Sequence, residues 1–137
     1  MTEPVVDTDV IVRYLTGDDP VKEAAATALF ERVERGELII SAPVTVIADA
    51  VFVLGSTRIY GRSRSAIRDM LLRILRLPGF RVDDRQLLIE ALDIYAVSNS
   101  GFGDAMIVAY MRRQRASTLY SYDRGFDRYA NLQRVEP

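Results

Sequence analysis

The chain has 137 residues, of which 49% are hydrophobic and 27% charged, and its formal net charge is −1. This length predicts one domain over 1–137 with its own buried core. The chain has no histidine and no cysteine, so the composition excludes zinc fingers, thiol nucleophiles, histidine bases, Ser-His-Asp triads and disulfides. Any catalysis must therefore use carboxylates, tyrosine, arginine or a bound metal ion.

The sequence gives no sign of a membrane segment. No run approaches the ~20 apolar residues of a membrane span, and the start, MTEPVVDTDV, lacks the basic and apolar stretches of a signal peptide. The lack of cysteine agrees with a reducing compartment. We expect a cytoplasmic protein that does not contact membrane.

Short apolar runs and helix-capping residues alternate along the first half of the chain. Residues 3–7 (EPVVD) predict a buried strand, and residues 10–15 a short helix. Asp18-Asp19-Pro20 combines a capping acid with an early proline, which favours a helix to about Arg35. Next come a predicted strand at 38–40 and a long apolar helix from Pro43 to about Tyr60.

The second half continues this alternation. Ser63 is predicted to cap a helix that runs to about Leu77, where Pro78-Gly79 ends it. The remaining expected elements are a strand at 80–82, a helix from 83 or 84 to about 97, a loop at 98–103, a helix at 104–115, a strand at 118–122, a helical turn at 123–129 and an edge strand at 132–135.

Strands that alternate with helices favour an α/β fold with a parallel sheet covered on both faces. In such sheets, sites form at the carboxyl ends of the strands. The chain has no repeats, linkers or low-complexity segments.

Four aspartates stand in apolar surroundings. Asp49 is the only charge between Glu37 and Arg58, and Asp104 is the only charge between Asp93 and Arg112. Asp7 follows the first predicted strand, and Asp123 follows the strand at 118–122. Local roles are the alternative: a first-turn helix acid for Asp104, a turn former for Asp123 and a partly exposed position on an amphipathic face for Asp49.

Considered together, the acids point to a metal site. Parallel strands would bring Asp7 and Asp123 to one edge of the sheet, and carboxylates held together repel each other unless a cation compensates them. Oxygen ligands without histidine or cysteine favour Mg²⁺ or Mn²⁺. We expect the four acids to converge in one pocket.

Four segments in this order and spacing resemble the sequence blocks of a PIN-domain ribonuclease of the VapC toxin type. They are VVDTDVIVRYLTGDDP, SAPVTVIADAVFVL, GFGDAMIVAYMRR and TLYSYDRGFDRY. The resemblance covers essentially the whole chain. It implies a PIN-like three-layer fold, with a central parallel sheet of about five strands flanked by helices, and a metal-dependent endoribonuclease held inactive by a small VapB-type antitoxin.

The resemblance also assigns roles to individual residues. Asp7, Asp104 and Asp123 match the acids of the first, third and fourth blocks, and Asp49 stands where the second block normally has Glu. We expect these four acids to be catalytic and metal-binding, with Asp7 and Asp104 as the first choices for direct ligands of Mg²⁺ or Mn²⁺. Thr8, Asp9 and Ser121 match positions beside the site. The implied reaction is attack of a metal-activated water on an RNA phosphodiester.

Charge does not mark the chain as a nucleic-acid binder, since its pI is about 5.5. Setting aside the four site acids makes the charge of the remainder positive, and Arg58, Arg62, Arg64 and Arg68 cluster at one helix junction. These arginines could contact phosphate or simply face solvent. The helix at 63–77 has apolar residues on more than one of its faces. Burial in the monomer would explain this, and so would contact with a second subunit or an antitoxin. We expect a homodimer.

Two other functions compete with the nuclease. A degenerate PIN domain could act only as an RNA- or antitoxin-binding module, with Asp49 marking the loss of activity. The opening VVDTDVI also resembles the Asp-x-Asp motif of haloacid-dehalogenase phosphatases, but that family needs a later lysine, and the only lysine, Lys22, is too close to the motif.

Overall fold

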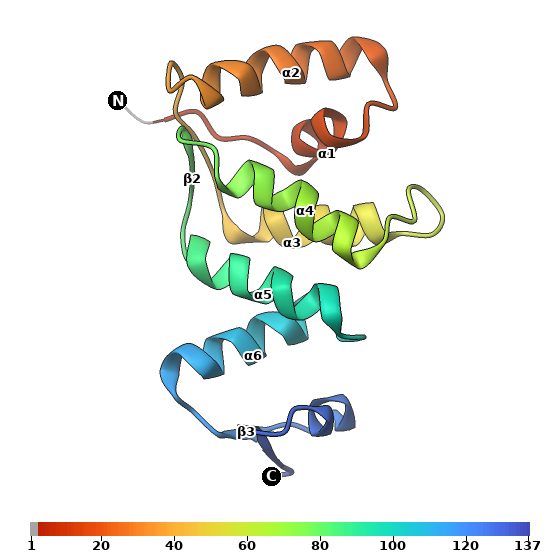
Figure 1. Ribbon diagram of the computed structural model, residues 1–137, viewed down its shortest axis with the longest axis vertical. Coiled ribbons are helices and arrows are strands. Elements are labelled where there is room, and N and C mark those ends of the chain that lie inside the picture. The colour runs from red at the N-terminus through yellow and green to blue at the C-terminus, as the bar shows by residue number, and fades with distance from the viewer. Residues whose placement is uncertain (1–2) are drawn as a thin grey trace.

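The computed structural model describes residues 3–137, and its helices stack into an elongated column (Figure 1). Helix α1 packs on α2 and α3, α4 lies between α3 and α5, and α6 packs on α5 and α3. The helices are α1 (Thr8–Thr16), α2 (Pro20–Glu34), α3 (Val44–Gly55), α4 (Arg64–Leu75), α5 (Arg85–Val97) and α6 (Phe102–Gln114).

Two helices, α2 and α4, begin at side-chain caps that the sequence identifies. The Asp19 side chain accepts a hydrogen bond from the backbone N of Lys22 at the start of α2, and the Ser63 hydroxyl accepts one from the backbone N of Ala66 at the start of α4. The first helix begins earlier than the predicted residue 10, because Asp7 caps α1 by accepting from the backbone N of Thr8. Each cap satisfies a backbone donor that the first helical turn leaves free.

Helix α3 ends earlier than the sequence predicts. The helix expected to reach Tyr60 ends at Gly55, because the next residues fold into turns in which the backbone N of Gly61 donates to Ser56 O. Gly61 has a φ of 56°, a left-handed conformation that glycine adopts without steric cost. No helix in residues 3–137 is long and apolar enough to cross a membrane.

The strands are short and form two separate parallel sheets. Strand β1 (Ile40–Ala42) pairs with β2 (Phe80–Val82), and β3 (Thr118–Tyr120) pairs with β4 (Gln133–Val135). A 3-10 helix, η1 (Arg124–Arg128), connects β3 to β4. The predicted α/β class with parallel strands is confirmed. The sheet is smaller than the single central sheet of about five strands that the resemblance implies.

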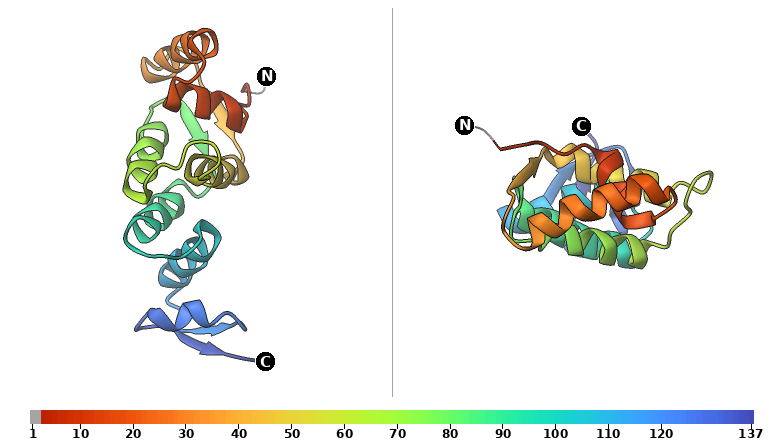
Figure 2. Two further views of the ribbon diagram at one scale, coloured as in Figure 1. Left: turned by 90° about the vertical axis from the view of Figure 1, so that its right-hand side faces the viewer. Right: turned by 90° about the horizontal axis from the view of Figure 1, so that it is seen from above.

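The first predicted strand explains part of this difference. Residues 3–7 pair with β1 through a single bridge between Val5 and Ser41, because the chain turns into α1 directly after Asp7. The β3–η1–β4 unit (residues 118–135) lies beyond α6, at the opposite end of the column from the N-terminal segment (Figures 1 and 2). The carboxyl ends of the strands therefore do not meet at one edge.

The apolar residues of the helix predicted at 63–77 are buried in the core of this chain. Its observed counterpart, α4, packs against α3, α5 and β2. The buried residues of α4 are Ile67, Leu71, Leu72, Ile74 and Leu75. Burial within the monomer thus explains this stripe, and α4 gives no support to a homodimer.

Candidate functional site

One pocket brings together two of the four predicted acids. Asp7, at the start of α1, and Asp49, on α3, line the same hollow, which we call the Asp7–Asp49 pocket. Thr8 and Asp9, both expected beside the site, also line it. The other lining residues are Val12, Arg13, Asp18, Phe52, Val53, Ile59 and Tyr60.

The two carboxylates keep oxygen atoms available to a ligand. Asp7 Oδ1 accepts a hydrogen bond of 2.6 Å from the backbone N of Thr8, and its Oδ2 accepts none from residues 3–137. Asp49 is exposed, and within the described part of the chain neither of its carboxylate oxygens is bonded. Thr8 Oγ1 lies 3.5 Å from Val46 O, which places the start of α1 beside α3. Free carboxylate oxygens are the donors that Mg²⁺ and Mn²⁺ prefer.

The other two acids lie elsewhere. Asp104 is half-buried in the first turn of α6, and Asp123 is exposed at the start of η1. Asp123 Oδ1 accepts from the backbone N of Gly125 at 2.8 Å, and the Ser121 hydroxyl accepts from the backbone N of Asp123 at 3.0 Å. These are the local roles that the sequence offered as alternatives for the two acids.

The predicted convergence of four acids is thus observed for Asp7 and Asp49 alone. Among residues 3–137, no three acidic side chains lie close enough to hold one ion together. The physical reason is the strand pairing: β3 pairs with β4 and not with the N-terminal segment, so Asp123 follows a strand that is remote from Asp7. Asp49 is exposed on α3, which agrees with the partly exposed position that the sequence offered as its local alternative.

A second pocket lies on the other side of Phe52. It is lined by residues of α3, of the loop that follows α3 and of the start of α6, and it includes Arg58 and Gly103. Phe52 lines both pockets. Asp104 directly follows Gly103, which places it next to this second pocket.

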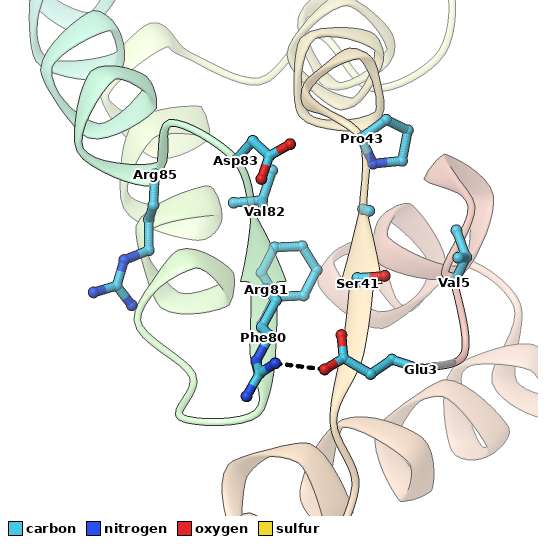
Figure 3. Close-up of a pocket in the computed structure, with 10 residues that line it drawn as sticks. Glu3, Val5, Ser41, Pro43, Phe80, Arg81, Val82, Asp83 and Arg85 are labelled. Atoms are coloured by element: carbon cyan, nitrogen blue, oxygen red, sulfur yellow. Dashed lines mark hydrogen bonds and ion pairs between the residues drawn. The ribbon is translucent and has the colours of Figure 1, made fainter. Parts of the chain in front are cut away.

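A third pocket, at the edge of β1 and β2, contains none of the predicted acids (Figure 3). Arg81 Nη1 donates to Glu3 Oε1 across it, and Arg85 Nη1 donates to Leu75 O at 3.3 Å. The charges at this edge are therefore largely engaged with one another or with backbone, and the Asp7–Asp49 pocket is the better candidate site.

Sequence reasoning missed a hydrogen-bonded cluster in the wall of the Asp7–Asp49 pocket. Asp18 accepts from Tyr60 Oη at 2.5 Å, from Arg13 Nη1 at 2.9 Å and from Thr16 Oγ1 at 3.0 Å. The bond from Tyr60 and then that from Arg13 lower the pKa of Asp18 to about 2, while Asp18 raises the pKa of Tyr60. The cluster joins the loop after α3 to the end of α1.

The lowered pKa of Asp18 predicts an acid-sensitive contribution to stability. The ionised carboxylate is favoured in the folded state, so its stabilising effect is complete above its ordinary pKa of 3.8 and is lost as the pH falls toward about 2. In thermal unfolding followed by circular dichroism, we expect Asp18→Asn to lower Tm near neutral pH, with the difference from wild type shrinking below pH ~4. A difference that stays constant down to pH ~2 would contradict this account. Tyr60→Phe, which removes one donor, should give a smaller effect of the same sign.

Comparisons with known proteins identify a family. A family model described as PIN domain matches residues 5–132. No curated protein matches the chain. Among solved structures, the chain is similar to the crystal structure of Mycobacterium tuberculosis VapC20, described as a sarcin-ricin loop cleaving toxin. The identity is 17%, the match covers 98% of this chain and 100% of that chain, and the TM-score is 0.41.

Proposed function

The chain belongs to the PIN-domain family, and on this premise we propose that it is a metal-dependent endoribonuclease that hydrolyses RNA phosphodiester bonds as the toxin of a toxin–antitoxin pair. The observation that carries the proposal is the Asp7–Asp49 pocket, since two acids of the expected blocks share one hollow within the matched residues 5–132.

In this proposal, Asp7 and Asp49 hold a divalent cation, Mg²⁺ or Mn²⁺. Their unbonded carboxylate oxygens fit a hard ion, and Mg²⁺ takes only one or two protein carboxylates while it keeps several waters. Such an ion, when bound, lowers the pKa of a water and offsets the charge that develops on the phosphate. Asp7 is held in place by its bond to the backbone of Thr8, so its free Oδ2 has a fixed direction.

Asp104 and Asp123 remain part of the proposed site through the family resemblance, although they lie outside the Asp7–Asp49 pocket. Asp9 and Thr8 would orient waters or substrate from the pocket wall, and Ser121 would support Asp123 through its bond to the Asp123 backbone. We further propose a VapB-type antitoxin as partner and the cytoplasm as the compartment. Self-association into a homodimer is a separate proposal, without support from α4.

The main test is cleavage by the purified chain. Incubation of a labelled RNA that contains single-stranded loops with Mn²⁺ or Mg²⁺ should give defined fragments, chelation with EDTA should stop cleavage, and added ion should restore it. Analysis on a sequencing gel separates internal cuts from shortening at the ends.

The same experiment separates the competing functions. RNA binding without cleavage under either ion would favour the binding module. Phosphate release from a small phosphomonoester, with a phosphoaspartate at Asp7, would favour the phosphatase. Lys22 lies in the first turn of α2 and does not line the Asp7–Asp49 pocket, so no lysine is present there for phosphatase chemistry.

A further inference from the structure

Phe52 occupies an unusual position for a large apolar side chain. It lies on α3, three residues after Asp49, and 79% of its surface is exposed. Residues three apart on a helix share a face, so the ring stands beside the Asp49 carboxylate. Since Phe52 lines both the Asp7–Asp49 pocket and the pocket with Arg58, it forms the ridge between them.

The two pockets carry opposite charges. The first contains Asp7 and Asp49, and the second contains Arg58 and Arg64. Arg64 is engaged, because its Nη1 donates to Tyr95 O at 3.0 Å and to Ser100 O at 2.7 Å and its guanidinium lies 4.2 Å from the Tyr95 ring centre. Arg58 is exposed and has no hydrogen bond or ion pair with residues 3–137. It is therefore available to an anion.

The surroundings of Phe52 suit a nucleic-acid base better than a protein surface. A stable protein interface buries about 800 Å² on each partner, whereas only Phe52 and Ile59, among the exposed large apolar residues, line these two pockets. One exposed aromatic face with a guanidinium on one side and carboxylates on the other matches a single nucleotide. Unpaired bases stack on such faces, while the bases of a duplex are already stacked.

We propose that Phe52 is the stacking platform for one unpaired RNA base beside the cleaved phosphodiester, and that Arg58 contacts the adjoining phosphate. This inference rests on the proposed function and deepens it. The RNA strand would cross Phe52 with one phosphate over the Asp7–Asp49 pocket and the next phosphate near Arg58.

The chain has no tryptophan, so the tryptophan fluorescence of a Phe52→Trp variant comes from position 52 alone. We expect single-stranded RNA, added in EDTA so that no cleavage occurs, to quench the fluorescence of this tryptophan in a saturable manner. A blunt duplex of the same sequence should not quench. Equal quenching by the duplex, or none by the single strand, would overturn the proposal.

Measurements of RNA affinity provide a second test of the roles of Phe52 and Arg58. In the same metal-free buffer, Phe52→Ala should weaken binding of single-stranded RNA about 5- to 150-fold, the range for loss of one base–aromatic stack, and Phe52→Tyr should restore it. Arg58→Gln should weaken binding and reduce its salt dependence. Tyr110→Ala is the matched control, because Tyr110 is an exposed aromatic residue on α6 that lines neither pocket.

The outcomes distinguish this inference from the proposed function. If the wild-type chain cleaves RNA and Phe52→Ala leaves KM and affinity unchanged, the inference fails while the nuclease stands. If the chain does not cleave but Phe52→Trp is quenched by single-stranded RNA, the nuclease fails while the base platform stands. A change in oligomeric state by light scattering with unaltered RNA affinity would assign Phe52 to a protein contact and overturn the inference.

Discussion

Asp7→Asn is expected to lower the rate of RNA cleavage by at least about 100-fold while leaving the fold intact. The substitution removes the negative charge that we assign to cation binding, and loss of one ligand or one preorganised electrostatic group costs roughly this factor. Asparagine caps helices about as well as aspartate, so α1 keeps its first turn. Cleavage kinetics and thermal unfolding on the same preparation measure both effects.

Asp7→Ala separates the two roles of this residue. It should lose cleavage equally and also about 1 kcal/mol of stability, because no side chain then accepts from the backbone N of Thr8. Asp19→Asn is the matched control, since Asp19 is also an N-terminal helix cap, accepting from the backbone N of Lys22, but does not line the Asp7–Asp49 pocket. It should keep full activity. Unaltered cleavage by Asp7→Asn would remove Asp7 from the site.

Gly79→Ala should cause the largest loss of stability among the Gly→Ala substitutions in residues 3–137, since its added Cβ meets the closest atom. Gly79 is buried in the turn directly before β2, and its carbonyl accepts from the backbone N of Ile40 in β1 at 2.9 Å. A Cβ at this position would lie 2.8 Å from Val33 O and closer still to Leu38 O. Both obstacles are backbone atoms, so neither can move aside by a change of rotamer.

We expect Gly79→Ala to cost about 3 kcal/mol, the upper range for overpacking, which corresponds to a fall in Tm of roughly 10 °C for a chain of this size. The control is Gly103→Ala in the first turn of α6, where an added Cβ meets no atom within 4 Å. Alanine favours helix over glycine, so this control should be neutral or slightly stabilising. Equal Tm values for the two variants would show that the backbone of Val33, in the last turn of α2, and that of Leu38 move aside.

Local signals in the sequence predict most helices and part of the site. The caps at Asp19 and Ser63 and the turn at Gly79 mark boundaries that the structure reproduces, because capping depends on neighbours a few residues away. Asp7 and Asp49 share a pocket as expected. The pairing of strands depends on long-range geometry, and three-residue strands carry little pattern to specify their partners.

Two features of the pocket could not be read from the sequence. The apolar flanks of Asp49 left its exposure open. In the structure, Ile47, Ala50 and Val51 are buried while Asp49 and Phe52 are exposed, a distinction set by helical position rather than by composition. The bond between Asp18 and Tyr60 joins residues 42 positions apart. No local pattern predicts such a contact, so the wall of the pocket became visible only in the structure.

The attachment of the β3–η1–β4 unit has a consequence for Asp123. The unit is joined to the helices through the buried Phe126, the partly buried Leu119 and Leu132, and a hydrogen bond between Tyr129 Oη and Ser100 Oγ. Segments with few buried apolar contacts open locally at a lower free energy than the central helices. We therefore expect Asp123 to lie in a part of the chain that opens more often than the helices holding Asp7 and Asp49, so that amide hydrogens of residues 118–135 exchange with solvent faster than those of α3.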